Sequence, residues 1–309
     1  MNVYKYSEWS QTAETLHMIL QMIGKTKLAL LPAQPEWGQI LLSPTARGFT
    51  SGFISDGENG FDIYVDLYAS EVIAYCIDGR VAQFSLRDDA YVSDYYRDFM
   101  KMLNDVSCQP TISTIPQEVG YDTRLEEQTE KRDYSAAHAQ AYFENCIFAY
   151  RALTRFASPY RCKKILPSLF WGTFDMTTVL FSGLEKPFSG SGTIERVAFD
   201  EQFAEFGFWP GDPTTDEPSF FAMPYPFLKT DLTDKNISPK EAFFSTEKKE
   251  FFLPLKAVLQ YEKPLAVVAQ FCTDAFQVIA QEETWPNMEW FCKPLDYAGA
   301  LPGLLGSVD

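Results

Sequence analysis

Five polar side chains near the N-terminus share one face of a predicted helix over residues 8–23. They are Ser10, Glu14, His17, Gln21 and Lys25. Spacings of three and four residues let such neighbours touch on a helix surface. A glutamate beside a histidine raises the imidazole pKa and orients the ring, as a general base requires. A solvated helix face has the same pattern, so the polar stripe predicts either a working imidazole or an exposed surface.

A second group of candidate residues lies in aromatic segments of the C-terminal half. Residues 170–175, Phe-Trp-Gly-Thr-Phe-Asp, place Trp171 and Asp175 on one face if they belong to a regular strand. Trp209 and Tyr225 lie in two further segments where aromatic residues adjoin glycine or proline. Aromatic walls with one carboxylate are suited to a small organic ligand. Aromatic residues also fill cores, but a buried carboxylate needs a partner or a function.

Arg47 is a third candidate, because it lies between a proline-led turn and a predicted strand. A guanidinium in that place pairs with a carboxylate or binds an anion, or else lies over apolar neighbours at the surface. Neither half of the chain offers both a polar cluster and an aromatic enclosure, so we expect any site to join them. The candidate acid and base are His17 and Asp175, and the candidate ligand-binding residues are Gln21, Lys25, Arg47, Trp171, Trp209 and Tyr225.

Familiar catalytic and cofactor motifs do not occur in the sequence. It has no G-x-G-x-x-G, Walker, H-E-x-x-H, EF-hand or G-x-S-x-G pattern. None of the six cysteines forms a C-x-x-C pair, and only two histidines are present. We therefore expect free, buried thiols, no metal site and no cofactor.

Strand and turn signals dominate the N-terminal half after its first helix, which Gly24 is suited to end. Residues 61–67 alternate apolar and polar side chains, and residues 72–77 form a second apolar run before Asp78-Gly79, a strong hairpin signal. We predict an antiparallel meander over residues 61–86 and, after it, a helix over residues 90–106 with Asp88 and Asp89 as cap candidates. The polar segment 116–133 is predicted to be a surface loop or linker.

The C-terminal half combines two predicted helices with aromatic strands. Helical periodicity extends over residues 135–156 and again over 264–282, where Pro264 suits a first turn. Two prolines interrupt the predicted strand over residues 220–227, which we therefore expect at a sheet edge. A hairpin is expected over residues 242–253.

Composition and charge exclude several classes of protein. The chain has 309 residues, of which 46% are hydrophobic and 16% aromatic, enough for a sizeable core. A net charge of −16 argues against a nucleic-acid surface, which needs Lys and Arg against phosphates. No apolar run approaches the roughly 20 residues of a membrane span, and the N-terminus lacks a signal-peptide core. We expect a cytoplasmic protein without nucleic-acid or membrane partners.

Several segments together resemble a bacterial family of unknown function, DUF5996. The matching segments are residues 9–10, 15–17, 21–25, 45–50, 170–175, 207–211 and 225–226. The resemblance extends from about Ser7 to Ala280 and implies no reaction, but it includes the polar stripe and residues 170–175. Members of the family often carry a histidine before Phe170, where this chain has Ser168 and Leu169. A mechanism with a second imidazole near Trp171 is therefore not expected.

The sequence predicts an α+β fold with two mainly antiparallel sheets covered by helices, not a doubly wound sheet. The predicted halves are residues 1–133 and 134–309, or the chain is one continuous domain. The leading hypothesis is a small-molecule or partner-binding protein without recognisable catalytic machinery. Two alternatives stay open: a hydrolase or lyase that uses His17 and Asp175, and an assembly protein with an aromatic interface. The residues predict neither a ligand nor an oligomeric state.

Overall fold

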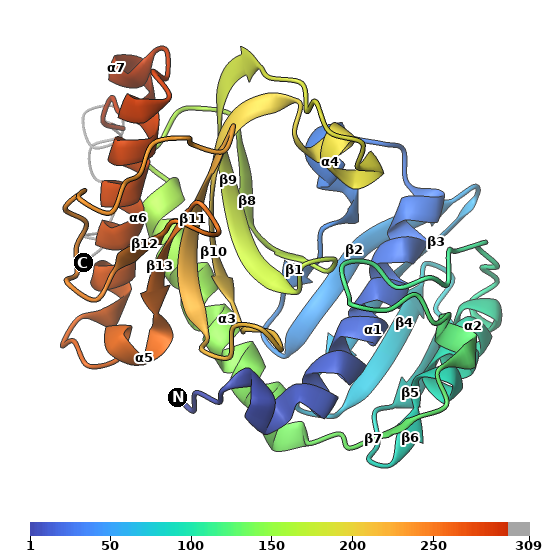
Figure 1. Cartoon of the computed structure of the whole chain (residues 1–309). Helices are drawn as coiled ribbons and strands as arrows, with labels where there is room; N and C mark the ends of the chain where they lie inside the picture. The colour runs from blue at the N-terminus through green and yellow to red at the C-terminus, as the bar shows by residue number, and fades with distance from the viewer. Residues whose placement is uncertain (296–309) are drawn as a thin grey trace, which may run out of the picture.

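The structure is a computed structural model that describes residues 1–295, in which two large antiparallel sheets are joined by helices and a third sheet has only the two strands β6 (Ala90–Tyr91) and β7 (Lys131–Arg132) (Figure 1). The helices and 3-10 turns are α1 (Tyr6–Leu30), η1 (Pro35–Ile40), α2 (Val92–Asp105), η2 (Leu125–Glu127), α3 (Ala136–Ala157), α4 (Thr193–Ala198), α5 (Leu255–Val258), α6 (Pro264–Glu282) and α7 (Met288–Phe291). The strands are β1 (Ser43–Pro44), β2 (Gly48–Asp56), β3 (Asn59–Asp66), β4 (Glu71–Cys76), β5 (Val81–Ser85), β6 (Ala90–Tyr91), β7 (Lys131–Arg132), β8 (Lys164–Phe170), β9 (Asp175–Glu185), β10 (Glu201–Trp209), β11 (Ser219–Tyr225), β12 (Phe243–Ser245) and β13 (Glu250–Pro254). The predicted α+β class is confirmed.

The first sheet has the strand order β1-β2-β3-β4-β5, so the predicted meander is confirmed. Its buried face carries Phe61, Ile63 and Val65, in the alternation that the sequence shows. The β4–β5 loop comprises residues 77–79, closed by the hydrogen bond from Cys76 N to Arg80 O at 2.9 Å. Gly79 has a φ of 90°, which only glycine adopts easily, and this explains the turn signal.

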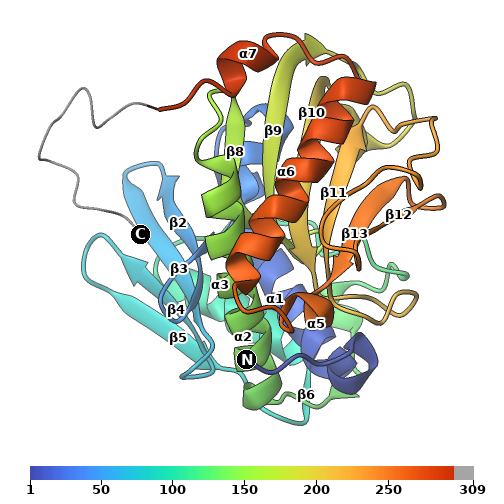
Figure 2. The ribbon, with the colours of Figure 1, turned by 90° about the vertical axis from the view of Figure 1, so that its left-hand side faces the viewer.

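The second sheet has the order β12-β13-β11-β10-β9-β8, and α3 and α6 cover one of its faces (Figure 2). Both of these helices and the β12–β13 hairpin agree with the sequence predictions. The expected edge position of β11 is wrong, because β11 lies between β13 and β10. The pairing of β11 with β13 ends at Ala222. Pro224 therefore has no β13 residue opposite it, and the N–H group that proline lacks is not required for a hydrogen bond to β13.

Helix α1 continues six residues beyond Gly24, so the predicted helix stop is wrong. A Cβ atom at Gly24 would lie 2.0 Å from Nε1 of Trp171. The glycine therefore serves the close approach of an indole ring rather than a helix end. The cap prediction for α2 is also wrong: its N-cap is Tyr91, and the Asp88 carboxylate accepts a hydrogen bond from Tyr134 N at 3.1 Å.

One hydrophobic core extends across both halves of the chain. Helix α3 lies at its centre, with Phe143 packed edge-on against Phe49 of the first sheet, centroids 5.7 Å apart, and Phe156 against Phe206 of the second at 4.5 Å. This continuity favours one continuous domain, and the boundary at residue 133 stays a prediction. Over residues 1–295, no helix combines the length and apolar character needed to cross a membrane.

Candidate functional site

A cavity of about 1330 Å³ lies against the face of the second sheet that α3 and α6 leave uncovered. Helices α1 and α4, η1 and the segment after α2 complete its walls, so both halves of the chain contribute. The aromatic part of the wall includes Trp37, Trp171, Trp209 and Phe221. The opposite face of the same sheet carries the core residues that pack on α3 and α6. Alternation along each strand thus separates a packed face from a hollow one.

Residues 170–175 form the tight turn between β8 and β9, not the regular strand that the sequence predicts. Phe170 pairs with Asp175, and Phe174 N donates to Phe170 O at 2.8 Å. Phe174 has a φ of 63°, an uncommon conformation for a side-chain-bearing residue. The turn places Trp171 against Gly24 of α1, where its Nε1 donates to Ile40 O at 3.1 Å. Asp175 follows at the start of β9 and lines the cavity.

His17 lies against this turn, as the predicted joining of the two halves requires. Its Nε2 lies 2.9 Å from Trp171 O and 3.0 Å from Gly172 O, so Nε2 carries the proton and donates to these carbonyls. Burial lowers the His17 pKa to about 4, although the two carbonyls partly offset it. The ring stacks on Phe174 at 4.9 Å. At neutral pH the imidazole is therefore uncharged, with Nδ1 as its basic atom.

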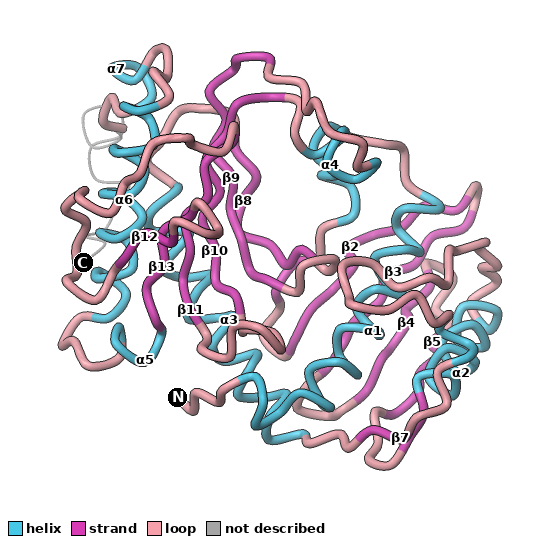
Figure 3. The backbone as a smooth tube through the Cα atoms, viewed as in Figure 1, coloured by secondary structure: helices cyan, strands magenta, loops and turns pink. Residues whose placement is uncertain are grey.

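The segment between α2 and β7 runs along α1 (Figure 3). Gln21 and Lys25 of α1 bind it through hydrogen bonds. The Gln21 amide donates to Gln117 O and accepts from Gln117 N, both at 2.8 Å. The Lys25 ammonium donates to Ser113 O at 3.0 Å and also to Ile115 O. The stripe is thus neither a solvated face nor a set of free donors at these positions. The expected surface linker is instead a strap bound to α1.

Three carboxylates of the second sheet line the cavity: Asp175, Glu205 and Glu250. Burial raises the Asp175 pKa well above its usual range, and the charge of Glu205 adds to this. Burial also raises the pKa of Glu205 and of Glu250 to about 7, partly offset by Thr177 and by Lys248 respectively. Desolvation disfavours the charged form of a carboxyl group. These groups therefore hold protons at a pH where ordinary carboxylates are ionised.

The strands place these carboxylates at one side of the sheet face. Thr177 of β9 lies opposite Gly207 of β10, and its Oγ1 donates to Glu205 Oε1 at 2.9 Å. Glu205 lies opposite Met223 of β11, and Glu250 begins β13 beyond it. No group of three or more His, Cys, Asp or Glu side chains within residues 1–295 is arranged to hold a metal ion. The carboxylates are thus spread along the wall.

Three of the predicted ligand-binding residues, Gln21, Arg47 and Tyr225, lie outside the cavity lining. Arg47 is exposed and pairs with Asp66 of β3, so its predicted pairing with a carboxylate is confirmed. Tyr225 is buried in a small aromatic cluster with Phe203 and donates from its hydroxyl to Lys186 O at 2.8 Å. Lys25, Trp171, Trp209, His17 and Asp175 line the cavity, and Gln21 lies beside His17.

The sequence predictions missed Glu205, Glu250 and Lys248. The available signal was an acid within an aromatic strand: Glu205 is flanked by Phe203 and Phe206. Lys248 lies in the β12–β13 turn, and its Nζ sits 4.8 Å from the Trp209 ring centroid. No local pattern connects that turn with Trp209, because they come from strands separated by β11.

Comparison with known proteins adds family membership but no activity. Residues 2–292 match the model of a family described as "Family of unknown function (DUF5996)". No curated protein and no solved structure matches the chain. The family model spans both halves, including the polar stripe, the β8–β9 turn and the carboxylate wall. The chain belongs to the DUF5996 family of unknown function.

Proposed function

We propose that this protein binds a small organic molecule in the cavity between α1 and the second sheet. The observation that carries the proposal is the cavity itself, about 1330 Å³ with a mainly apolar wall that includes aromatic rings and several charged groups. This volume exceeds the roughly 300–1,000 Å³ of typical ligand pockets, so the cavity has room for a small organic molecule. Protein interiors otherwise pack as densely as organic crystals. A hollow of this size beside a tightly packed opposite face is the arrangement expected of a binding site.

An enzyme that uses His17 and Asp175 is the second candidate. It is favoured by the opposite pKa shifts of the two groups, since burial lowers the pKa of the His17 imidazole to about 4 and raises the pKa of the Asp175 carboxyl well above its usual range. Groups whose environments separate their pKa values are typical acid–base pairs. Both line the same cavity, so a hydrolase or lyase would use the same ligand site.

The assembly alternative receives less support. It requires the aromatic segments to form a flat apolar patch at the surface. Trp171 is only 4% exposed, and the turn that carries it faces α1. We also propose a cytoplasmic protein with no nucleic-acid partner, supported by six free cysteines and the net charge of −16.

Filling the cavity tests the binding proposal. Ala29 lies exposed on α1 and lines the cavity, so Ala29→Phe occupies space without replacing a core residue. Ala137 is exposed on α3 and lies outside the lining, which makes Ala137→Phe the matched control. Binding is measured by native mass spectrometry and by ligand-observed NMR against a fragment library. We expect Ala29→Phe to lose binding and Ala137→Phe to keep it. A wild-type protein that binds no fragment, or equal binding by both variants, contradicts the proposal.

A further inference from the structure

Two carboxylates of the cavity wall, Asp175 and Glu205, lack cationic partners among residues 1–295. Asp175 is only 4% exposed, and no ion pair in this range includes Asp175, Glu205 or Glu250. From other residues, the Asp175 carboxylate receives only the hydrogen bond of Thr173 at Oδ1, and that of Glu205 only the bond of Thr177 at Oε1. The second oxygen of each carboxyl group is thus left without a partner from these residues, on side chains that line the cavity. Buried charge without a partner is costly.

Other charges in the cavity do not compensate Asp175 and Glu205. Lys25 is bound to two carbonyl groups of the strap, and its ammonium is held there. The other charges that act on Asp175 are those of Glu205 and Glu118, which are also acidic. An anionic ligand would meet only repulsion from this wall, whereas a cation would replace the missing partner.

Part of the same wall already binds a cation that belongs to the chain. The Lys248 ammonium lies 4.8 Å from the centroid of the Trp209 ring, and its charge acts on Glu250. An ammonium over an indole face is attracted by the ring, and a neighbouring carboxylate strengthens the site. The wall thus combines the two kinds of group that recognise organic cations. Lys248 occupies only one end, and Asp175 and Glu205 lie beyond it.

We propose that the cavity binds an organic cation, a primary amine or related ammonium on a flat or apolar body, with its charge at Asp175 and Glu205. This inference rests on the proposed binding function and names the class of ligand. The body of the ligand lies against Trp171 and against Phe221 of β11. Burial favours the protonated form of these carboxyl groups. A bound cation stabilises the ionised form, so binding releases a proton.

Matched sets of probes test the charge of the ligand. Each set has one body with an amine, a hydroxyl or a carboxylate: tryptamine with tryptophol and indole-3-acetate, and phenethylamine with 2-phenylethanol and phenylacetate. Calorimetry at neutral pH in buffers of different ionisation enthalpy measures affinity and proton release together. We expect the amine to bind about tenfold more tightly than the alcohol, with release of up to one proton per bound amine and no binding of the acid.

The variants assign the effect to the wall. Glu205→Gln is expected to reduce the ratio of amine affinity to alcohol affinity severalfold. It should also lower the number of protons released per bound amine. Glu58→Gln removes one charge from an exposed turn of the first sheet and should change neither. Equal loss in both variants would overturn the assignment to Glu205, because it would reflect net charge alone.

The outcomes separate this inference from the proposed function. If alcohols bind as tightly as amines, or acids bind more tightly, the cation inference is wrong while binding in the cavity stands. If neither these probes nor the fragment library binds, both proposals are wrong. Tight amine binding that Ala29→Phe leaves intact also overturns the inference, because the amine then binds outside the cavity.

Discussion

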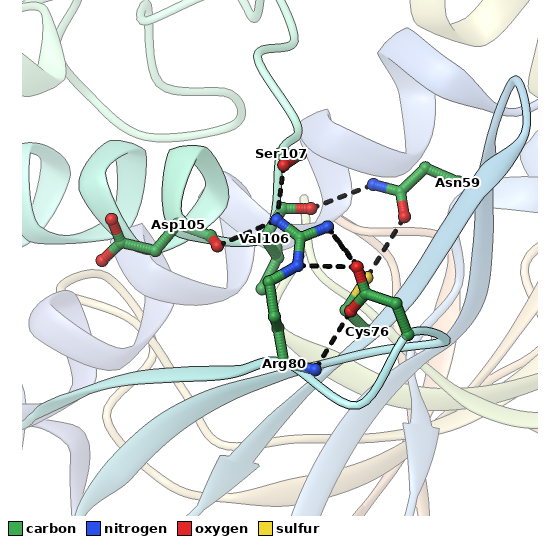
Figure 4. Close-up of polar contacts among 7 residues, drawn as sticks. Asn59, Cys76, Arg80, Asp105, Val106 and Ser107 are labelled. Atoms are coloured by element: carbon green, nitrogen blue, oxygen red, sulfur yellow. Dashed lines mark hydrogen bonds and ion pairs between the residues drawn. The ribbon is translucent and has the colours of Figure 1, made fainter.

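Acidic side chains have opposite environments in the two sheets. In the first sheet, Asp78 is paired with Arg80, whose guanidinium holds the pKa of that carboxyl well below its usual range. Arg80 also donates to Asp105 O at 3.3 Å and to Ser107, which links the β4–β5 turn to the end of α2 (Figure 4). In the second sheet, burial raises the pKa of Asp175 and Glu205, and no cation of residues 1–295 pairs with them.

The acidic side chains of the two sheets therefore have different roles: some stabilise the fold through ion pairs, and others lie at the cavity, unpaired within the described part of the chain. In the first sheet, Asp66 and Asp78 each pair with an arginine, Arg47 or Arg80, and Arg80 also connects elements of the fold. In the second sheet, Asp175, Glu205 and Glu250 lie on a hollow face, where burial of their charge costs stability. A group that costs stability in the free protein gains a partner when a ligand arrives. The comparison therefore predicts that substitutions of the two kinds of acid have opposite effects.

Gly24→Ala tests the packing that buries Asp175 in the second sheet. We expect the largest loss from this variant, about 3 kcal/mol in the free energy of unfolding. The new Cβ would lie 2.0 Å from the Trp171 ring and would push the β8–β9 turn away from α1. Water would then reach Asp175, so its pKa should fall towards the usual range. Chemical denaturation and carboxyl NMR titration measure both effects. Gly120→Ala is the control, because its Cβ meets open space. Equal stability of the two variants would contradict this prediction.

Glu205→Gln tests the cost of the unpaired carboxylate. Because the folded pKa is about 7 and the usual value 4.5, the protonated group favours the folded state, and this contribution is lost as pH rises from 4.5 through 7. We expect the variant to exceed the wild type by about 2 kcal/mol above pH 7, allowing for water in the cavity, and to match it below pH 4.5. Urea denaturation across this range measures the difference. A variant less stable than the wild type above pH 7 would disprove the assignment.

His17→Phe tests the same cavity with the opposite sign of pH dependence. The His17 pKa falls from 6.5 to about 4, so the wild type loses stability as pH falls from 6.5 towards 4. At neutral pH the variant should lose about 1 kcal/mol, because the hydrogen bonds to Trp171 O and Gly172 O are gone. Because the wild type loses more stability than this between pH 6.5 and 4, the difference in free energy of unfolding should narrow and then reverse sign as the pH falls. A stability difference between wild type and variant that stays constant from pH 6.5 to 4 would contradict the buried, neutral imidazole.

Arg47→Gln has the smallest expected effect. It tests the first sheet, where an acid has an arginine partner, against the second sheet, where the acids of the cavity wall have none among residues 1–295. It removes the partner of Asp66, and exposed ion pairs contribute little to stability. We expect a small destabilisation that diminishes at high ionic strength. Its sign is opposite to that of Glu205→Gln above pH 7. A stabilised variant at low ionic strength would remove the distinction between the two sheets.

Local rules predicted the elements whose pattern lies within a few residues. The alternation over residues 61–67 predicted β3, and Pro264 with its apolar periodicity predicted α6. The same rules failed where a distant segment decided the outcome. Gly24 looked like a helix stop because the sequence does not show that an indole more than a hundred residues away needs its space. The expected strand at residues 170–175 became a turn, because its register depends on pairing with β9.

The candidate site was predicted in part for the same reason. His17 and the β8–β9 turn meet as expected, and Lys25 and Trp209 share their cavity. Arg47 and Tyr225 lie elsewhere, because a residue's type does not reveal which surface its strand will face. Glu205 and Glu250 were missed because an acid in an aromatic strand is unremarkable until its neighbours are known.

The sequence by itself determined the meander, the long helices, the α+β class and the family, since these follow from short-range periodicity and matching segments. Only the tertiary structure decided that the strap covers the polar stripe of α1 and that Asp175, Glu205 and Glu250 share one hollow wall. Periodicity acts over a few residues. The burial of a charge depends on segments far apart in the chain, and it was their packing that set the protonation of this wall.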